Sequence, residues 1–532
     1  MDVQEARFPC GRRGAGAQSF AVVALFGLAL ACLPAAANLL SNPGFESDPG
    51  GEGQTLPGWQ IYGPNVYNET AASVAHGGAN YLKIYQAFDG AVNYSGVYQD
   101  YLSAPGATYV AGGWAFTAAN DVLTGKNAAW LEVTFRDALG NILALFRSPL
   151  VTTNALASGA FPENQWTWLP ITNQYDPATF QPTGSVSCLT APAGTFFLRF
   201  QIVFQGDAAG SAGSMYFDDL QLTQTGRGNM NIVWSDEFDG SSLNTNIWTY
   251  DIGNGHSGWG NQELEYYTDR TNNAFVADGL LHLVARRESF NGFDYTSARL
   301  KSQGLFSLQY GRLEWRAKLP CGVGLWPALW LLGTNLTSLG WPTCGEMDVM
   351  ENTGTNVFMA QGSLHWGGDA TAIYRFTDGE ATTNFNTYTL DWTTNAILFY
   401  VNGHLYQRQT NWSSAAGPYP FPFNQPFFLL MNLAVGGNYV GNPTTQAINA
   451  GAVFPAEMLV DYVRLYRLTE PFRIAIRKTG ADLILNWPGD ILCHLEVQTN
   501  ELGTNWVPIA ASTNQFPIAP GPASAFYRLA MP

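Results

Sequence analysis

The segment Trp341–Asn352 reads WPTCGEMDVMEN and places three carboxylates within six residues of an otherwise apolar stretch. Its apolar residues are typical of a strand that lies in a hydrophobic core. An acid in such a strand is costly unless it is paired or performs chemistry. The segment therefore predicts a catalytic strand inside a β-rich domain.

Side chains alternate along an extended strand, so Glu346 and Asp348 share a face, whereas Glu351 would point to the opposite face. A β-bulge at Val349 or Met350 would return Glu351 to the face of the other two acids, and bulges are common beside active sites. We therefore predict a bulge at this point. The alternative, three acids on an ordinary solvated strand, predicts polar residues throughout and does not fit the apolar residues between the acids.

Three acids on one face suit the hydrolysis of a glycosidic bond with retention of configuration. That reaction needs one carboxylate that attacks the anomeric carbon and one carboxylic acid that protonates the leaving oxygen, with about 5 to 5.5 Å between them. Glu346 and Glu351 are candidates for this pair. Asp348 lies between them and is placed to orient Glu346 and to modulate the shared proton.

Further motifs flank this strand in a fixed order. They are WSDEFDG at 234–240, WGNQELEYYT at 259–268, GLWPALW at 324–330, NLAVGG at 432–437 and VDYVRLY at 460–466. Together with EMDVME at 346–351, they resemble the laminarinase-like members of glycoside hydrolase family 16. The resemblance covers residues 231–468, nearly half of the chain, and implies that Glu346 is the nucleophile, Asp348 its assistant and Glu351 the general acid/base.

The resemblance also implies the fold and the binding residues. It implies a jelly-roll, concanavalin A-like β-sandwich with the substrate in a groove across one sheet, and no cofactor for catalysis. Asn261 and Arg299 would bind sugar hydroxyls, Trp326 and Trp330 would form subsite platforms, and His365 would lie near Glu351.

A structural calcium ion is a further implication of the resemblance. Its ligands would be Glu237, Asp461 and the carbonyl of Gly279. Calcium prefers hard oxygen ligands of this kind.

The composition sets limits on the class of protein. A chain of 532 residues exceeds one ordinary core, so we expect two or three domains. With 46% hydrophobic and 12% charged residues the chain is globular. Its net charge of −16 argues against nucleic acid or an anionic membrane as a partner and favours a neutral substrate.

Short alternating runs between Gly, Pro and Asn clusters predict an all-β chain, which polar breaks divide near residues 223–231 and 469–471. Residues 38–225 resemble a jelly-roll carbohydrate-binding module, because NPGFE at 42–46 and YFDDLQL at 216–222 match the two ends of such modules. An exposed subset of its rings would stack on sugar, with Trp59, Tyr62, Tyr67, Trp114 and Trp168 as candidates. The alternative is a β-sandwich spacer with buried rings. Residues 472–532 are expected to form a small β-sandwich-like tail without chemistry.

Residues 1–37 have the features of a secretory signal peptide: arginines, an apolar run at 20–33 and the triplet Ala35–Ala37. We therefore expect a secreted protein, with a periplasmic or a Cys32-anchored form as alternatives. No later stretch is long and apolar enough for a membrane span. Export permits disulfides, and pairing of Cys321 with Cys344 remains open at this stage.

Taken together, the sequence predicts a secreted, monomeric, retaining endo-β-glucanase that cuts 1,3-β-glucan of the laminarin type. A hydrolase of mixed-linkage glucan or algal galactan is an alternative, because the same carboxylates would serve it. A non-catalytic β-glucan-binding protein is another alternative, which the three intact acids disfavour. The sequence leaves open whether the sugar is transferred to water or to another sugar.

Overall fold

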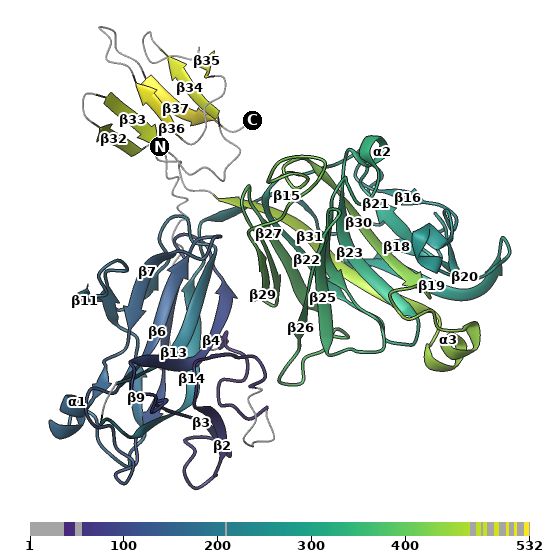
Figure 1. Cartoon of the computed structure of the whole chain (residues 1–532). Coiled ribbons are helices and arrows are strands. Elements are labelled where there is room, and N and C mark those ends of the chain that lie inside the picture. Colours follow the sequence, from purple (N-terminus) through teal and green to yellow (C-terminus); the bar gives the residue numbers. More distant parts are fainter. Residues whose placement is uncertain are drawn as a thin grey trace, which may run out of the picture. The chain divides into compact units, whose positions relative to one another are not determined.

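The computed structural model describes residues 37–47, 56–207 and 210–468, and in the tail the segments 475–479, 482–486, 494–498, 507–509, 515–518 and 526–530. All but the last residue of the predicted signal peptide lie outside the described residues. Nearly all regular elements of the described chain are strands, its helices are short, and the predicted all-β fold is confirmed (Figure 1). None of its described helices has the length and apolar character that crossing a membrane requires.

The first module consists of two facing antiparallel sheets around one hydrophobic core. One sheet contains β1 (Gln60–Tyr62), β4 (Asn93–Leu102), β13 (Phe197–Gly206), β6 (Ala128–Arg136), β7 (Ile142–Arg147), β10 (Asn173–Tyr175) and β11 (Pro182–Ser185), with β8 (Val151–Thr152) beside β6. The other contains β12 (Leu189–Thr190), β5 (Thr108–Phe116), β14 (Ser214–Gly226), β3 (Asn80–Tyr85) and β2 (Val66–Thr70), with β9 (Thr167–Pro170) beside β5. A short helix, α1 (Thr153–Ala157), follows β8.

The rings predicted to contact sugar in this module differ in burial. Trp59 is 5% exposed, packs against Phe45 and donates its indole N–H to the Asn42 carbonyl, so this candidate is a core residue and does not belong to the exposed subset. Tyr62, Tyr67, Trp114 and Trp168 are half-buried.

The catalytic region is a second sandwich of two sheets. The sheet that carries the predicted catalytic strand contains β16 (Thr249–Asp251), β21 (Arg299–Lys301), β30 (Phe427–Val435), β23 (Leu325–Gly333), β24 (Glu346–Glu351), β25 (Met359–His365) and β26 (Asp369–Arg375) in that order. The facing sheet contains β15 (Met230–Asp236), β18 (Ala274–Ala277), β19 (Leu280–Phe290), β31 (Ala456–Leu468), β22 (Gly311–Lys318), β27 (Asn386–Trp392), β28 (Ile397–Val401) and β29 (His404–Gln409). The remaining elements are β17 (Glu265–Tyr267), β20 (Phe293–Ser297), a π-helical turn (Gly258–Gln262), α2 (Leu336–Leu339) and α3 (Thr445–Gly451).

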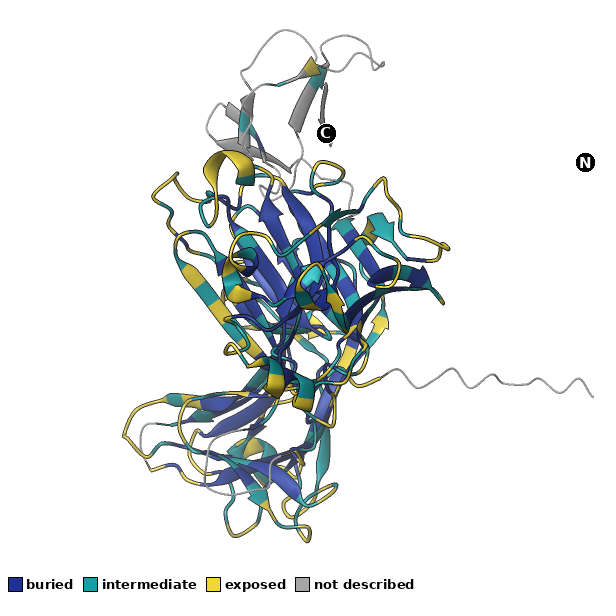
Figure 2. Cartoon of the chain, turned by 90° about the vertical axis from the view of Figure 1, so that its right-hand side faces the viewer, coloured by how far each residue is buried: buried dark blue, intermediate teal, exposed yellow. Residues whose placement is uncertain are grey.

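Alternation along the strands separates the core from the groove side of the seven-stranded sheet. On β23, Leu325, Leu329 and Leu331 lie in the core between the sheets, whereas Trp326 and Trp330 face the opposite way. Figure 2 shows buried strands in dark blue inside this domain and exposed residues mainly in its loops. One face of the seven-stranded sheet is therefore free to bind a ligand.

The tail contains two three-stranded sheets in its described segments. One has the order β32 (Ala475–Thr479), β33 (Asp482–Asn486) and β36 (Gln515–Ile518). The other has the order β35 (Val507–Pro508), β34 (His494–Gln498) and β37 (Phe526–Ala530). Two small sheets agree with the predicted β-sandwich-like tail.

Candidate active site

A groove of 640 Å³ runs across the free face of the seven-stranded sheet. Each of the seven strands contributes to it, with Asp251 from β16, Arg299 from β21, Leu430 from β30, Trp326 from β23, Glu346 from β24, Gln361 from β25 and Thr371 from β26. A binding surface built on strands is held more rigidly than one built on loops. All eight residues predicted for catalysis and substrate binding line this groove.

The predicted bulge in β24 is confirmed. On the regular neighbour β23, the partners of Glu351, Asp348 and Glu346 are residues 328, 330 and 332, which are two apart and so share a face. The pairing with β25 shifts between Asp348 and Glu351 as well. Val349 and Met350 both enter the core, so the extra residue is absorbed there and all three acids face the groove.

Glu346 lies in the groove beside Trp341, whose indole N–H donates to Glu346 Oε2 at 2.8 Å. Burial raises the pKa of Glu346 well above its usual value, and the negative charges of Asp348 and Glu351 act in the same direction. The positive charge of His365 and the hydrogen bond from Trp341 oppose this shift. These two residues therefore favour the ionised form that a nucleophile needs.

Glu351 has a different set of partners. The indole N–H of Trp326 donates to Glu351 Oε1 at 3.0 Å, and the amide of Gln361 lies 3.5 Å from Oε2. Burial, followed by the charge of Asp348, raises the pKa of Glu351 to about 8. Glu351 is thus protonated at neutral pH, as a general acid must be.

His365 forms ion pairs with two aspartates. Its Nε2 lies 3.2 Å from Asp348 Oδ2, and its Nδ1 lies 2.5 Å from Asp369 Oδ1. Burial disfavours the charged ring, but the contacts with Asp348 and Asp369 outweigh burial and raise the pKa of His365 to about 10. The strand register places His365 opposite Glu346, and Gln361 opposite Glu351. His365 is also close enough to Glu351 for its positive charge to lower the pKa of that acid, and both residues line the same groove.

Aromatic rings and hydrogen bonds fix the other predicted binding residues. The Arg299 guanidinium lies 4.7 Å from the ring centres of both Trp259 and Trp330, and its Nε is 3.0 Å from Asp251. Trp330 donates to the Asn432 side-chain oxygen at 2.7 Å. Arg299 is thereby held in one orientation before any ligand arrives.

A chain of polar contacts continues from Asn432 to Asn261. Asn432 donates to the Tyr267 hydroxyl at 3.1 Å, and Tyr267 donates to Glu263 at 3.0 Å. Glu263 also accepts from the Asn261 amide at 3.3 Å. The chain links two predicted binding residues, Trp330 and Asn261, that lie far apart in the sequence.

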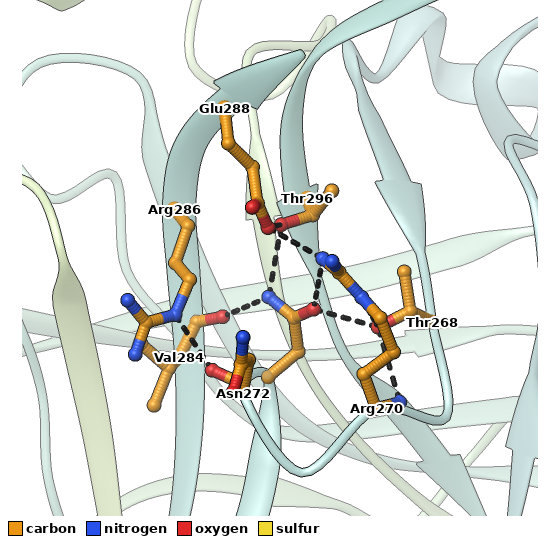
Figure 3. Close-up of polar contacts among 8 residues, drawn as sticks. Thr268, Arg270, Asn272, Val284, Arg286, Glu288 and Thr296 are labelled. Carbon is orange, nitrogen blue, oxygen red and sulfur yellow. Dashed lines mark hydrogen bonds and ion pairs between the residues drawn. The ribbon is translucent and has the colours of Figure 1, made fainter. Parts of the chain in front are cut away.

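A polar network anchors the strand that follows Asn261, at the end of β17 (Figure 3). Asn273 accepts from Thr268 at 2.6 Å and donates to the Val284 carbonyl at 2.9 Å and to the Thr296 hydroxyl at 3.0 Å. Arg270 bridges Asn273 and Glu288. These contacts tie the residues that follow β17 to β19 and β20.

The sequence did not identify several residues that line the groove. Trp259, Trp341, Tyr439, Asp251 and Gln361 are in this group. Trp259 begins the motif WGNQELEYYT and Trp341 begins the segment WPTCGEMDVMEN, so the sequence could have indicated both as groove residues. Tyr439 stacks on Trp326 at 4.9 Å and Asp251 pairs with Arg299, and neither contact leaves a local pattern in the sequence.

The disulfide between Cys321 and Cys344 does not form, and both residues are free thiols. Cys321 is exposed, whereas Cys344 is fully buried against Leu332, Phe428 and Leu430. Burial raises the pKa of the Cys344 thiol to about 11, so this group stays protonated and unreactive.

The three predicted calcium ligands do come close to one junction in the facing sheet. β15 and β19 pair with successive parts of the same edge of β31, so Glu237, Gly279 and Asp461 lie near the gap between them. Both carboxylates are already paired, Glu237 with Arg464 through two hydrogen bonds and Asp461 with Arg316. The oxygens would have to leave these arginines to hold an ion, and calcium at this junction stays a prediction.

Among the described residues, Glu346, Asp348 and His365 are the one group of three whose ligand atoms lie within 4.8 Å of one another. A metal ion needs a neutral imidazole. With a pKa of about 10, the His365 ring is cationic at neutral pH. The trio fits an acid–histidine ion pair better than a metal site.

Comparisons with known proteins find similar sequences and structures. The model of the glycosyl hydrolases family 16 matches residues 256–458. A beta-glucanase of Rhodothermus marinus is 44% identical over 256 residues, which are 45% of this chain and 86% of that protein. A glucan endo-1,3-beta-glucosidase of Niallia circulans is 39% identical over 262 residues, 45% of this chain but only 38% of that protein. The solved structure of a laminarinase from Rhodothermus marinus shows 42% identity, covers 45% of this chain and 98% of its own, and has a TM-score of 0.41.

Proposed function

The chain belongs to the glycosyl hydrolases family 16, and we propose that it hydrolyses internal 1,3-β linkages of glucan with retention of configuration. The observation that carries the proposal is the bulged strand β24, which presents three acids to one groove. Two relatives named for glucan hydrolysis, one of them for the 1,3 linkage, support this substrate.

The proposed reaction has two steps. In the first, Glu346 attacks the anomeric carbon while Glu351 gives its proton to the glycosidic oxygen, so the leaving sugar departs and a glycosyl ester forms on Glu346. In the second, Glu351 takes a proton from water, the water oxygen attacks the anomeric carbon, and Glu346 is released. The contacts of each acid support these roles, since Glu351 is protonated at neutral pH and Trp341 and His365 favour ionised Glu346.

The other groove residues have proposed roles in positioning. Asp348 lies between the two glutamates and pairs with His365. This ion pair limits the movement of Asp348 and of His365. Arg299 and Asn261 line the groove and carry N–H groups that suit sugar hydroxyls, and Trp326 and Trp330 offer flat surfaces. The groove crosses the whole sheet, which suits cleavage within a long chain.

Removal of either glutamate tests the mechanism. Glu346→Gln and Glu351→Gln should each lower kcat on laminarin by about 10²-fold to 10⁴-fold or more, with the fold unchanged by circular dichroism. Glu163→Gln, which removes an exposed acid of the first module, is the control and should retain full turnover. Near wild-type hydrolysis by Glu346→Gln would contradict the mechanism.

A product profile by mass spectrometry tests the substrate. We expect oligosaccharide products from laminarin, fewer from mixed-linkage lichenan, and none from agarose or carrageenan. Hydrolysis of a galactan in preference to laminarin would contradict the proposed substrate. Binding of laminarin without products would instead favour a glucan-binding protein.

We also propose that the chain is exported and acts as a monomer. The support for export is an apolar segment that follows several arginines near the N-terminus, together with the triplet Ala35–Ala37. The mature protein recovered outside the expressing cells should begin at Asn38, as read by N-terminal sequencing, and should elute as a single chain of the corresponding mass. A protein that retains residues 1–37 in the cell would contradict export.

A further inference from the structure

A second ligand-sized pocket lies in the first module, on the outer face of the sheet β1-β4-β13-β6-β7-β10-β11. Its volume is 570 Å³. It is lined by Tyr62, Tyr94, Tyr98, Trp130, Glu132, Arg147, Phe180, Arg199, Gln201, Val203 and Gln205. None of these residues except Tyr62 was a candidate from the sequence.

Strand register explains why these side chains meet. Tyr98, Gln201, Glu132 and Arg147 are direct partners across β4, β13, β6 and β7, so they form one row across the sheet. The neighbours of Gln201 on β13, Phe200 and Ile202, point into the core instead. The row therefore belongs to the outer face.

At the floor of the pocket, the buried charge of Glu132 is paired within a hydrogen-bond network. Glu132 is 5% exposed, accepts from Gln201 at 2.5 Å and Trp130 at 3.1 Å, and pairs with Arg147 at 2.7 Å. Arg147 in turn lies 4.8 Å from the ring centre of Trp130. Such a network is rigid before a ligand binds, which lowers the entropic cost of binding.

The second arginine of the pocket is paired in the same way. Arg199 binds Asp100 through two hydrogen bonds at 2.7 and 2.8 Å and covers the Tyr98 ring at 3.6 Å. Each arginine thus has its own carboxylate, and the pocket has no net charge to offer an anion. Its remaining hydrogen-bonding groups suit the hydroxyls of an uncharged ligand.

Two aromatic rings at the rim are exposed. Tyr94 is 51% exposed and Phe180 is 49% exposed, although large apolar rings on a solvated face usually lose exposure by packing. Flat rings beside neutral hydrogen-bonding groups match the two kinds of surface of a sugar ring, its C–H faces and its hydroxyl edges.

From this combination we propose that the pocket binds a segment of neutral glucan chain, the same polymer that the catalytic groove cuts. The inference rests on the proposed function for the identity of the polymer. It assigns Tyr94 and Phe180 as stacking residues and Gln201, Gln205 and the Arg147–Glu132 pair as contacts for hydroxyls. Two binding sites in one chain would increase the affinity for a long polymer, because the second contact is intramolecular.

The test uses the full chain with Glu346→Gln, so that the polymer is not cut during binding. Adding Tyr94→Ala and Phe180→Ala should weaken binding to insoluble 1,3-β-glucan by about tenfold, measured by depletion from solution. Phe88→Ala is the matched control, because Phe88 is a 63% exposed phenylalanine of the same module, has the same positive φ as Phe180 and does not line the pocket. It should leave binding unchanged, and all variants should melt at the same temperature.

The outcomes separate this inference from the proposed function. Equal binding by the Glu346→Gln chain with and without the two alanines would overturn the pocket while wild-type hydrolysis of laminarin still stood. A wild-type chain that cuts no glucan but loses glucan binding with the two alanines would contradict the proposed function and support the pocket. Loss of binding in Phe88→Ala to the same extent would also overturn the pocket, since the effect would not be local to it.

Discussion

At the scale of single residues, each catalytic glutamate has its own tryptophan partner. Trp341 donates an N–H to Glu346 and Trp326 donates one to Glu351. Both bonds favour the ionised carboxylate and lower its pKa. The consequences for activity differ, because the reaction needs Glu346 ionised and Glu351 protonated.

The variant Trp326→Phe keeps an aromatic ring and removes only the N–H at Glu351. The pKa of Glu351, about 8 in the native chain, should then rise, so the acid keeps its proton to higher pH. We expect the alkaline limb of kcat/KM to move upward by about 0.5 to 1 pH unit. A pH profile on soluble laminarin checks this, and a downward shift would contradict the assigned contact.

The variant Trp341→Phe should act on the other limb. Loss of the N–H raises the pKa of Glu346, so a smaller fraction of the nucleophile is ionised at a given acidic pH. The acidic limb should move upward by about 0.5 pH unit, a modest value because Trp341 is 60% exposed. The alkaline limb should stay in place, and a shift of both limbs together would show that the contact is not specific to Glu346.

At the scale of elements, the sequence predicted what depends on periodicity. Three acids separated by apolar residues required a bulge, and the structure has it at Val349 and Met350. The sequence could not predict which residues lie opposite one another on neighbouring strands. The partner of His365 depends on the shifted register of β24, and the pocket in the first module depends on four strands meeting in one row.

The burial of Trp59 shows the same limit. A tryptophan after a glycine in a polar stretch gives no sign of which side of the sheet it will face, and its indole N–H is satisfied by a carbonyl 17 residues away. The aromatic residues that stack on ligands are of the same types as those in cores, and the two groups differ in exposure.

The junction of β15, β19 and β31 allows a test of the calcium prediction. An ion that binds only the folded chain stabilises it, by about 2.7 kcal/mol when the ion is at 100 times its Kd. We expect calcium to raise the melting temperature of the full chain and Glu237→Gln to remove that increase. A melting temperature that neither calcium nor a chelator changes would show that the arginine pairs of Glu237 and Asp461 persist.

At the scale of the whole molecule, the chemistry is confined to one part of the chain. All lining residues of the catalytic groove lie between Asp251 and Tyr439, and the last strand of that sandwich, β31, ends at Leu468. A second site for the polymer in the first module would affect only binding, since the acids and their partners all belong to the same sandwich.

Removal of residues 472–532 should therefore leave catalysis intact. No groove residue is lost, and the groove sheet and its facing sheet keep all of their strands. We expect kcat and KM on soluble laminarin within about twofold of the full chain, a free-energy difference of about 0.4 kcal/mol. A truncated chain that folds by circular dichroism but loses turnover would show that the tail contributes to the active site, whereas unchanged turnover with weaker retention on insoluble glucan would assign the tail to polymer binding.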